Sequence, residues 1–204
     1  MQILPQALRI FQGEFPRVRV MMHDLSTGEM LSGLRDGKLH VALTVQPGAN
    51  QLRGLHFDEL ARYPICVAVP PNHALAKARS VPWTKLANES LIAYSRAEYP
   101  EYHEELDTLA KLVGTKPRIA EEHDSVTSVI AAVEAGRGVA FVSSSMQCLA
   151  GPRLKMLPFK PAFPPLVVGA LYLNPPGALA GQFILAVKQA AKEASPPLLG
   201  RRAA

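Results

Sequence analysis

Apolar residues follow two spacings along the chain. In residues 3–14 they recur every three or four positions, which predicts an amphipathic helix. In other segments they alternate or run together, which is typical of strands. The pattern predicts further helices between residues 26 and 37 and at 101–113, 126–135 and 178–193. It predicts strands at 18–22, 39–45, 64–69, 91–95, 117–123 and 166–173, and one within "GRGVAFVSSSM". This alternation indicates an α/β fold.

Residue types at the element ends support these predictions. Ser26 with Glu29 three residues later forms a capping-box pattern at a helix start. In "GLRDGKLHVALTV", Gly37 can take the left-handed conformation that ends a helix before a strand. Asp124 or Ser125 is expected to cap the helix that follows. A coil-rich stretch at 46–63 and prolines at 158–165 mark two places where the chain can cross between lobes.

Composition narrows the class of protein. The chain has 204 residues and a net charge of +5, but its cations are scattered, which is weak evidence for nucleic-acid contact. No apolar run approaches the roughly 20 residues of a membrane span, and the first residues lack a signal-peptide pattern. Cys66 and Cys148 do not form a C-x-x-C pair. We therefore expect a soluble, cytoplasmic protein that makes no membrane contact.

Catalytic and metal-binding patterns are missing from the sequence. It contains no G-x-S-x-G elbow, P-loop or H-E-x-x-H motif. The six histidines have no partners at ligand spacing, so no metal site is expected. "GRG" at 136–138 follows a helix and precedes a strand, the reverse of a phosphate-binding loop. We expect neither enzymatic activity nor a cofactor.

Three segments are candidates for binding a small molecule. Two helix starts, at 26–28 and 124–126, follow predicted strands and offer free backbone N–H groups to a carboxylate, although ordinary N-capping explains them as well. The segment "YSRAEYPEYH", 94–103, places an arginine and three tyrosines just past a strand end. A plain surface loop is the alternative there.

Four blocks of sequence together resemble a known family. They are "FQGEFPRVRV…GLRDGKLHVAL", "VAVPPNHALA", "VPWTKLANESLIAY" and "DSVTSVIAAVEAGRGVAFVSSSM". Their order and spacing over residues 2–192 resemble the effector-binding half of a LysR-type transcriptional regulator. Within that family, "YSRAEYPEYHEEL" and "EEHDSVTSVIAAVEAG" look closest to the branch that responds to intermediates of aromatic degradation.

The resemblance implies a two-lobed fold of the periplasmic-binding-protein type (type 2), with lobe I from 1–60 plus 168–204 and lobe II from 61–167. It also implies that the N-terminal winged helix-turn-helix, the linker helix and the family's first strand are absent from this sequence. The chain would then be a fragment or a natural remnant of a regulator. The family usually has an aspartate where this chain has His40, which we interpret as a tolerated substitution near the sheet edge rather than a catalytic base.

The resemblance also implies a site and partners. The expected effector is a small organic anion, aromatic or dicarboxylic, bound between the lobes. The residues expected to bind it are Ser26, Thr27, Gly28, Ser95, Arg96, Pro100, Tyr102, Asp124 and Ser125. We expect a homodimer or tetramer that associates through Leu4, Leu8 and Phe11 of the first helix and through the helix 101–113. DNA contact would come only from the N-terminal domain. A stand-alone solute-binding protein of the same fold is the alternative function.

Overall fold

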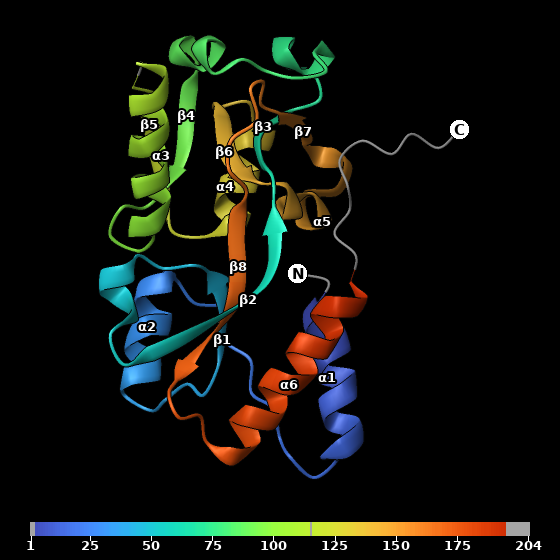
Figure 1. The fold of residues 1–204 in the computed structure, drawn as a ribbon. Coiled ribbons are helices and arrows are strands. Elements are labelled where there is room, and N and C mark those ends of the chain that lie inside the picture. Colours follow the sequence, from blue (N-terminus) through green and yellow to red (C-terminus); the bar gives the residue numbers. More distant parts are fainter. Residues whose placement is uncertain (1–2, 115, 195–204) are drawn as a thin grey trace. The chain divides into compact units, whose positions relative to one another are not determined.

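The computed structural model describes residues 3–114 and 116–194 (Figure 1). The expected tail at 195–204 and the side chains of Leu112 and Val113 lie outside the described part. The chain divides into two compact units. Unit 1 comprises residues 1–24, 33–62 and 167–204, and unit 2 comprises residues 25–32 and 63–166. Helix α2, Thr27–Arg35, runs across this boundary.

Unit 1 combines a pair of helices with a small sheet. Helix α1 (Ile3–Glu14) lies beside α6 (Ala178–Glu193), as Figure 1 shows. Their contact surface is apolar, and the ring of Phe11 meets the edge of Phe183 at a centroid distance of 5.4 Å. The sheet has the order β1-β8-β2, and its strands are β1 (Ala42–Val45), β8 (Leu166–Leu173) and β2 (Leu55–Tyr63).

A polar network ties the strands of unit 1 to α6. The Tyr172 hydroxyl donates to Asp58 Oδ2 at 2.6 Å, and Lys188 Nζ reaches the same oxygen at 2.8 Å. Burial and the Asp58 carboxylate raise the pKa of Tyr172 to about 12. The tyrosine therefore stays neutral and keeps donating its hydrogen bond across the physiological pH range.

Unit 2 contains a mixed five-stranded sheet with helices on its faces. The strand order is β5-β4-β6-β3-β7; β4 is parallel to β5 and β6, while β3 is antiparallel to β6 and β7. The strands are β3 (Ile65–Val69), β4 (Ser90–Tyr94), β5 (Arg118–His123), β6 (Val139–Ser143) and β7 (Lys155–Pro158). The helices are α3 (Pro100–Val113), α4 (Val126–Glu134) and α5 (Gln147–Ala150).

Successive side chains of a strand point to opposite sides of the sheet, so each strand contributes to the packing on both faces. On one face Val67, Leu91 and Phe141 pack with Leu106 and Leu109 of α3. On the other face, apolar side chains of the same strands pack against α4; they include Ala68, Ile92 and Ala140. The remaining elements are short 3-10 turns at Ala49–Leu52, Ala74–Lys77, Trp83–Asn88, Ser144–Met146 and Gly151–Arg153.

Most predicted elements are present, but one predicted strand does not form, and strands β2 and β7 and the short helix α5 were not predicted. The predicted strand at 18–22 does not form: in the described part of the chain no neighbour pairs with it, and Met21 and Met22 are largely exposed. An extended segment becomes a strand only when a neighbour completes its hydrogen-bond ladder. Strand β2 lies in the stretch that the sequence pattern assigned to coil, and β7 begins three residues before the expected proline-rich connection at 158–165.

The described residues, 3–114 and 116–194, include no helix with the length and apolar content needed to cross a membrane. Gly37 and Gly114 end their helices with positive φ angles of 70° and 68°, as predicted.

Gly169 of β8 provides a test of packing in unit 1. A Cβ atom at this position would press against the carbonyl oxygen of Asp58 and the ring of Phe57 on the neighbouring strand. We expect Gly169→Ala to lower the free energy of unfolding by about 1–3 kcal/mol, the usual range for overpacking. Denaturant titration measures this. Gly13→Ala is the control, because a Cβ there meets nothing and the substitution suits a helix; equal stability of the two variants would contradict the packing.

Candidate functional site

The first turn of α2 is organised by a capping box. The Ser26 backbone N–H donates to Glu29 Oε2 at 2.8 Å, and the Glu29 N–H donates to the Ser26 hydroxyl at 3.3 Å. The bonds from Ser26 also lower the pKa of Glu29. The predicted cap is therefore confirmed, and Ser26 is the residue at which the helix begins to form its hydrogen bonds.

Two carboxylates from the segment 98–101 bind the hydroxyls at this helix start. The Ser26 hydroxyl lies 2.6 Å from Glu98 Oε2 and 3.0 Å from Glu29 Oε2, so its single proton is best placed for Glu98. The Thr27 hydroxyl donates to Glu101 Oε1 at 2.6 Å. In addition, the Gly28 N–H points to the carbonyl oxygen of Glu98 at 3.4 Å. Side chains of the protein thus occupy the hydroxyl groups that the sequence analysis assigned to an external anion.

Glu101 is the most unusual group of this cluster. It is the second residue of α3, only 9% of it is exposed, and its Oε2 atom is buried without a hydrogen-bond partner in the described residues. Burial raises the pKa of Glu101, and the bond from Thr27 opposes that shift. A carboxyl group in this environment is held toward its neutral form.

Three tyrosines line the segment between β4 and α3. The Tyr94 ring lies 4.9 Å from the Tyr99 ring and 5.1 Å from the Tyr102 ring, measured between centroids. Burial raises the pKa of Tyr94 and Tyr102, so both phenols are neutral. The Tyr102 ring is only partly exposed because it packs against the core beneath α3, near Phe141. Pro100 is the first residue of that helix, a position that suits proline.

The segment that begins at Ser95 is also fastened to the end of β5. The Ser95 N–H donates to the carbonyl oxygen of His123 at 2.8 Å, and the Arg96 N–H donates to Glu122 Oε2 at 3.2 Å. The Arg96 guanidinium, more than half exposed, lies 3.9 Å from Asp107. Its charge is thus partly balanced by an acid on α3.

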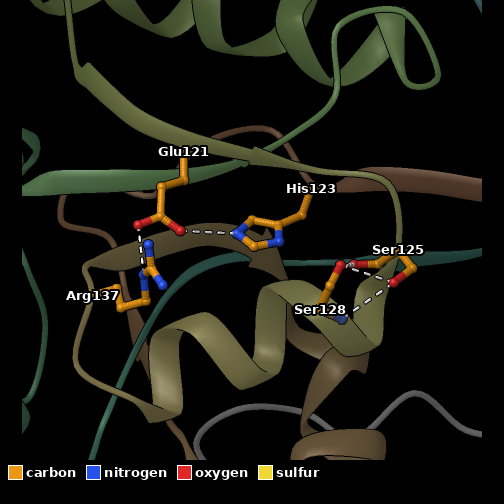
Figure 2. A network of polar contacts seen from close by, with 5 residues as sticks. All are labelled: Glu121, His123, Ser125, Ser128 and Arg137. Carbon is orange, nitrogen blue, oxygen red and sulfur yellow. Dashed lines mark hydrogen bonds and ion pairs between the residues drawn. The ribbon is translucent and has the colours of Figure 1, made fainter.

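Ser125 caps α4 rather than standing free for a ligand. Its hydroxyl accepts the Ser128 N–H at 3.2 Å, as Figure 2 shows. The preceding residue, Asp124, accepts the Tyr99 hydroxyl at its carbonyl oxygen, 2.9 Å away. Of the two expected capping residues, Ser125 is the one that caps the helix.

All nine predicted site residues lie in unit 2, in two neighbouring groups. Residues 26–28 bond to the segment 98–101, whereas Ser95 and Arg96 adjoin the segment 122–125. In the described part of the chain no group of three or more His, Cys, Asp or Glu side chains could hold a metal ion.

The sequence analysis missed several polar residues of this region. Glu98 and Glu101 flank the pair Tyr99–Pro100, and the sequence analysis gave neither of them a role. His103 is almost fully buried and donates from Nε2 to the carbonyl oxygen of Tyr94 at 2.7 Å. Figure 2 shows Glu121 between His123 and Arg137, at 3.3 and 2.6 Å. In "EYPEYH" Glu98 and Glu101 are three residues apart on either side of the helix start. This spacing was the only indication in the sequence that the two acids lie close together.

Comparison with known proteins decides the family. The model of the LysR substrate binding domain matches residues 1–192. The chain belongs to this family. The transcriptional regulator AlsR of Bacillus subtilis is 26% identical over 72% of the chain and 48% of its own length, so the chain spans about half of that relative. The family and its neighbours are effector-binding domains of transcriptional regulators, not enzymes.

Solved structures of the family share the fold of this LysR-type domain. The effector-binding domain of QuiR in complex with shikimate has a TM-score of 0.80 at 18% identity and covers 94% of this chain and 91% of its own. The BenM effector-binding domain with its effector benzoate has a TM-score of 0.76 at 17% identity and covers 98% and 92%. The expected periplasmic-binding-protein-like architecture is therefore confirmed.

Thr27→Val tests the bond at the start of α2. Valine keeps the shape but leaves the buried Glu101 carboxyl without its donor. We expect the free energy of unfolding to fall by about 1–3 kcal/mol, the cost of an unsatisfied buried polar group. Thr108→Val is the control, since the Thr108 hydroxyl bonds only to a carbonyl oxygen of its own helix. An equal loss in both variants, measured by denaturant titration, would contradict a special role for the Thr27 bond.

Proposed function

We propose that this LysR-type domain senses a small organic acid, aromatic or dicarboxylic, and thereby controls a DNA-bound regulator. The observation that carries the proposal is the start of α2, where the hydroxyls of Ser26 and Thr27 and the backbone N–H of Ser26 already bind carboxylates of the protein itself. A helix start that binds carboxylates of the protein itself has the hydrogen-bond donors that the carboxylate of a ligand needs. The relatives crystallised with shikimate and benzoate support the same class of ligand, since both are carboxylates.

The proposed binding residues have different roles in holding the ligand, which follow from the chemistry of their side chains. The backbone N–H groups around Thr27 receive the carboxylate, with the positive end of the helix dipole behind them, and the Thr27 hydroxyl holds the Glu101 carboxyl beside it. Arg96 supplies a cation that can form a bidentate bond. The partly exposed ring of Tyr102 and the adjoining Pro100 supply an apolar wall. The full proposed set is Ser26, Thr27, Gly28, Ser95, Arg96, Pro100, Tyr102, Asp124 and Ser125.

The proposed organisation extends to lobes and partners. We infer that residues 1–60 plus 168–204 form regulatory lobe I and 61–167 form lobe II. DNA would be bound by an N-terminal domain that these 204 residues do not include. Because a sensor of this kind acts where the DNA is, we infer a cytoplasmic location, and the free thiols of Cys66 and Cys148 suit a reducing compartment.

Ligand binding is tested by thermal unfolding with benzoate, shikimate and succinate. An acid that binds should raise the unfolding midpoint; at 100 times its Kd it stabilises the protein by about 2.7 kcal/mol. Benzamide is the matched control, because it keeps the ring and lacks the charge. Thr27→Val should weaken binding of the acid by about 1–2 kcal/mol. If none of the acids shifts the midpoint, or if benzamide acts as strongly as benzoate, the proposal is wrong.

Self-association is the second testable part of the proposal. The expected surfaces are α1 and α3, although Phe11 is buried within unit 1, which leaves the half-buried Leu4 and Leu8 as the contribution of α1. An isologous pair needs two complementary faces on one chain. We expect sedimentation to show a homodimer or a tetramer at micromolar concentration. Only monomer at high micromolar concentration would contradict this.

A further inference from the structure

The inner oxygen of Glu101 is one of three buried polar atoms of this region that have no hydrogen-bond partner in the described residues; the other two are the Tyr102 hydroxyl and His103 Nδ1. Oε1 of this carboxyl receives the Thr27 hydroxyl, while Oε2 is buried and has no partner in the described residues. A buried carboxylate that is satisfied on one oxygen only is costly, and the neutral acid is less so. Since Thr27 donates to Oε1, the proton of the neutral acid belongs on Oε2. There it is a hydrogen-bond donor without an acceptor.

The charges around Glu101 favour the same protonation state. The nearest acids outside its own helix are Glu29 of α2 and Glu98 of the preceding loop, which both lie within hydrogen-bond distance of the Ser26 hydroxyl, next to Thr27. On its own helix Glu104 also raises the pKa of Glu101, after burial, while His103 acts in the opposite direction. Further groups in the surrounding elements are the phenols of Tyr94 and Tyr102, which are neutral, and Glu122 of β5, whose carboxylate lies 3.8 Å from His103.

We propose that Glu101 is a ligand-binding residue that acts as a neutral acid, donating a hydrogen bond from Oε2 to the carboxylate of the effector beside Thr27. The proposal rests on the function proposed above. It explains how an organic anion can bind among several acids, because a protonated carboxyl is a strong donor to a carboxylate. The same carboxyl in its ionised form would repel the ligand. Protonated Glu101 therefore favours the binding of an anion, and this binding requires one proton on the Glu101 carboxyl.

Because the complex requires a proton on Glu101, the affinity for the effector depends on pH. The bound anion raises the pKa of Glu101 further, so the complex takes up a proton wherever free Glu101 is ionised. Affinity is greatest below the pKa of Glu101 in the free protein. Above it, affinity falls by about tenfold per pH unit until the pKa of the complex is reached.

The protonation state can be measured without any ligand. The chain is labelled with ¹³C at the glutamate side-chain carboxyls, and the Glu101 signal is identified by its loss in Glu101→Gln. We expect this signal to titrate above the ordinary glutamate value of about 4.3. A midpoint at or below that value would overturn the inference and leave the proposed function standing.

The ligand experiment is calorimetry at pH values on both sides of the midpoint that the carboxyl titration gives for free Glu101, with whichever of benzoate, shikimate or succinate binds most tightly. Buffers of different ionisation enthalpy report the protons taken up. Above that midpoint the parent should take up close to one proton and lose about tenfold in affinity per pH unit. Glu101→Gln should bind without this slope and, above the midpoint, more tightly than the parent, because the amide donates and carries no charge.

Glu105→Gln is the matched control. It removes a carboxylate from the same helix, one that makes no contact with Ser26 or Thr27 among the described bonds, and it should keep the slope of the parent. Binding by the parent that is independent of pH, or an unchanged slope in Glu101→Gln, would overturn the role of Glu101 alone. Failure of every acid to bind the parent would overturn the proposed function and this inference together.

Discussion

A carboxyl group taken out of water needs a hydrogen-bond donor, and at the junction of α2 and α3 the Thr27 hydroxyl supplies it to Glu101. This bond joins the first turns of two helices that are more than seventy residues apart in the sequence. Glu98 and Ser26 make a second, parallel link. Both helix starts therefore have fixed positions relative to each other, and the geometry of the proposed site follows from that pair of bonds.

The surrounding packing keeps this junction rigid. Pro100 starts α3 immediately before Glu101, and Leu106 and Leu109 anchor the same helix on the five-stranded sheet. On the opposite face α4 packs against apolar residues of the strands, and its first turn is capped by Ser125. The polar groups of the proposed site thus lie on elements whose positions are set by apolar burial, which is how a site can hold its shape while its surface stays polar.

Sequence patterns predicted the elements that bury one continuous apolar stripe. Helices α1, α3 and α6 were found in this way, with bounds within one residue of those observed. Strand β2 was not predicted because its polar and apolar residues do not alternate along the whole strand. The segment 18–22 was wrongly predicted as a strand because its residues alternate, although no neighbouring strand pairs with it in the described part of the chain. For the site, the cap at Ser26 could be read from local spacing. The partners of Ser26 and Thr27 could not, because Glu98 and Glu101 reach them only through tertiary packing.

The path of the chain through the two units sets an order of events during synthesis. All strands of unit 2 lie between residues 65 and 158, so its sheet can close as soon as that stretch has left the ribosome. Unit 1 must wait, because α1 packs on α6 and β1 pairs with β8, both near the other end of the chain. Until those last elements emerge, the apolar face of α1 has no cover. A chaperone that shields this face of α1 would therefore protect the nascent chain from misassociation until β8 and α6 have been made.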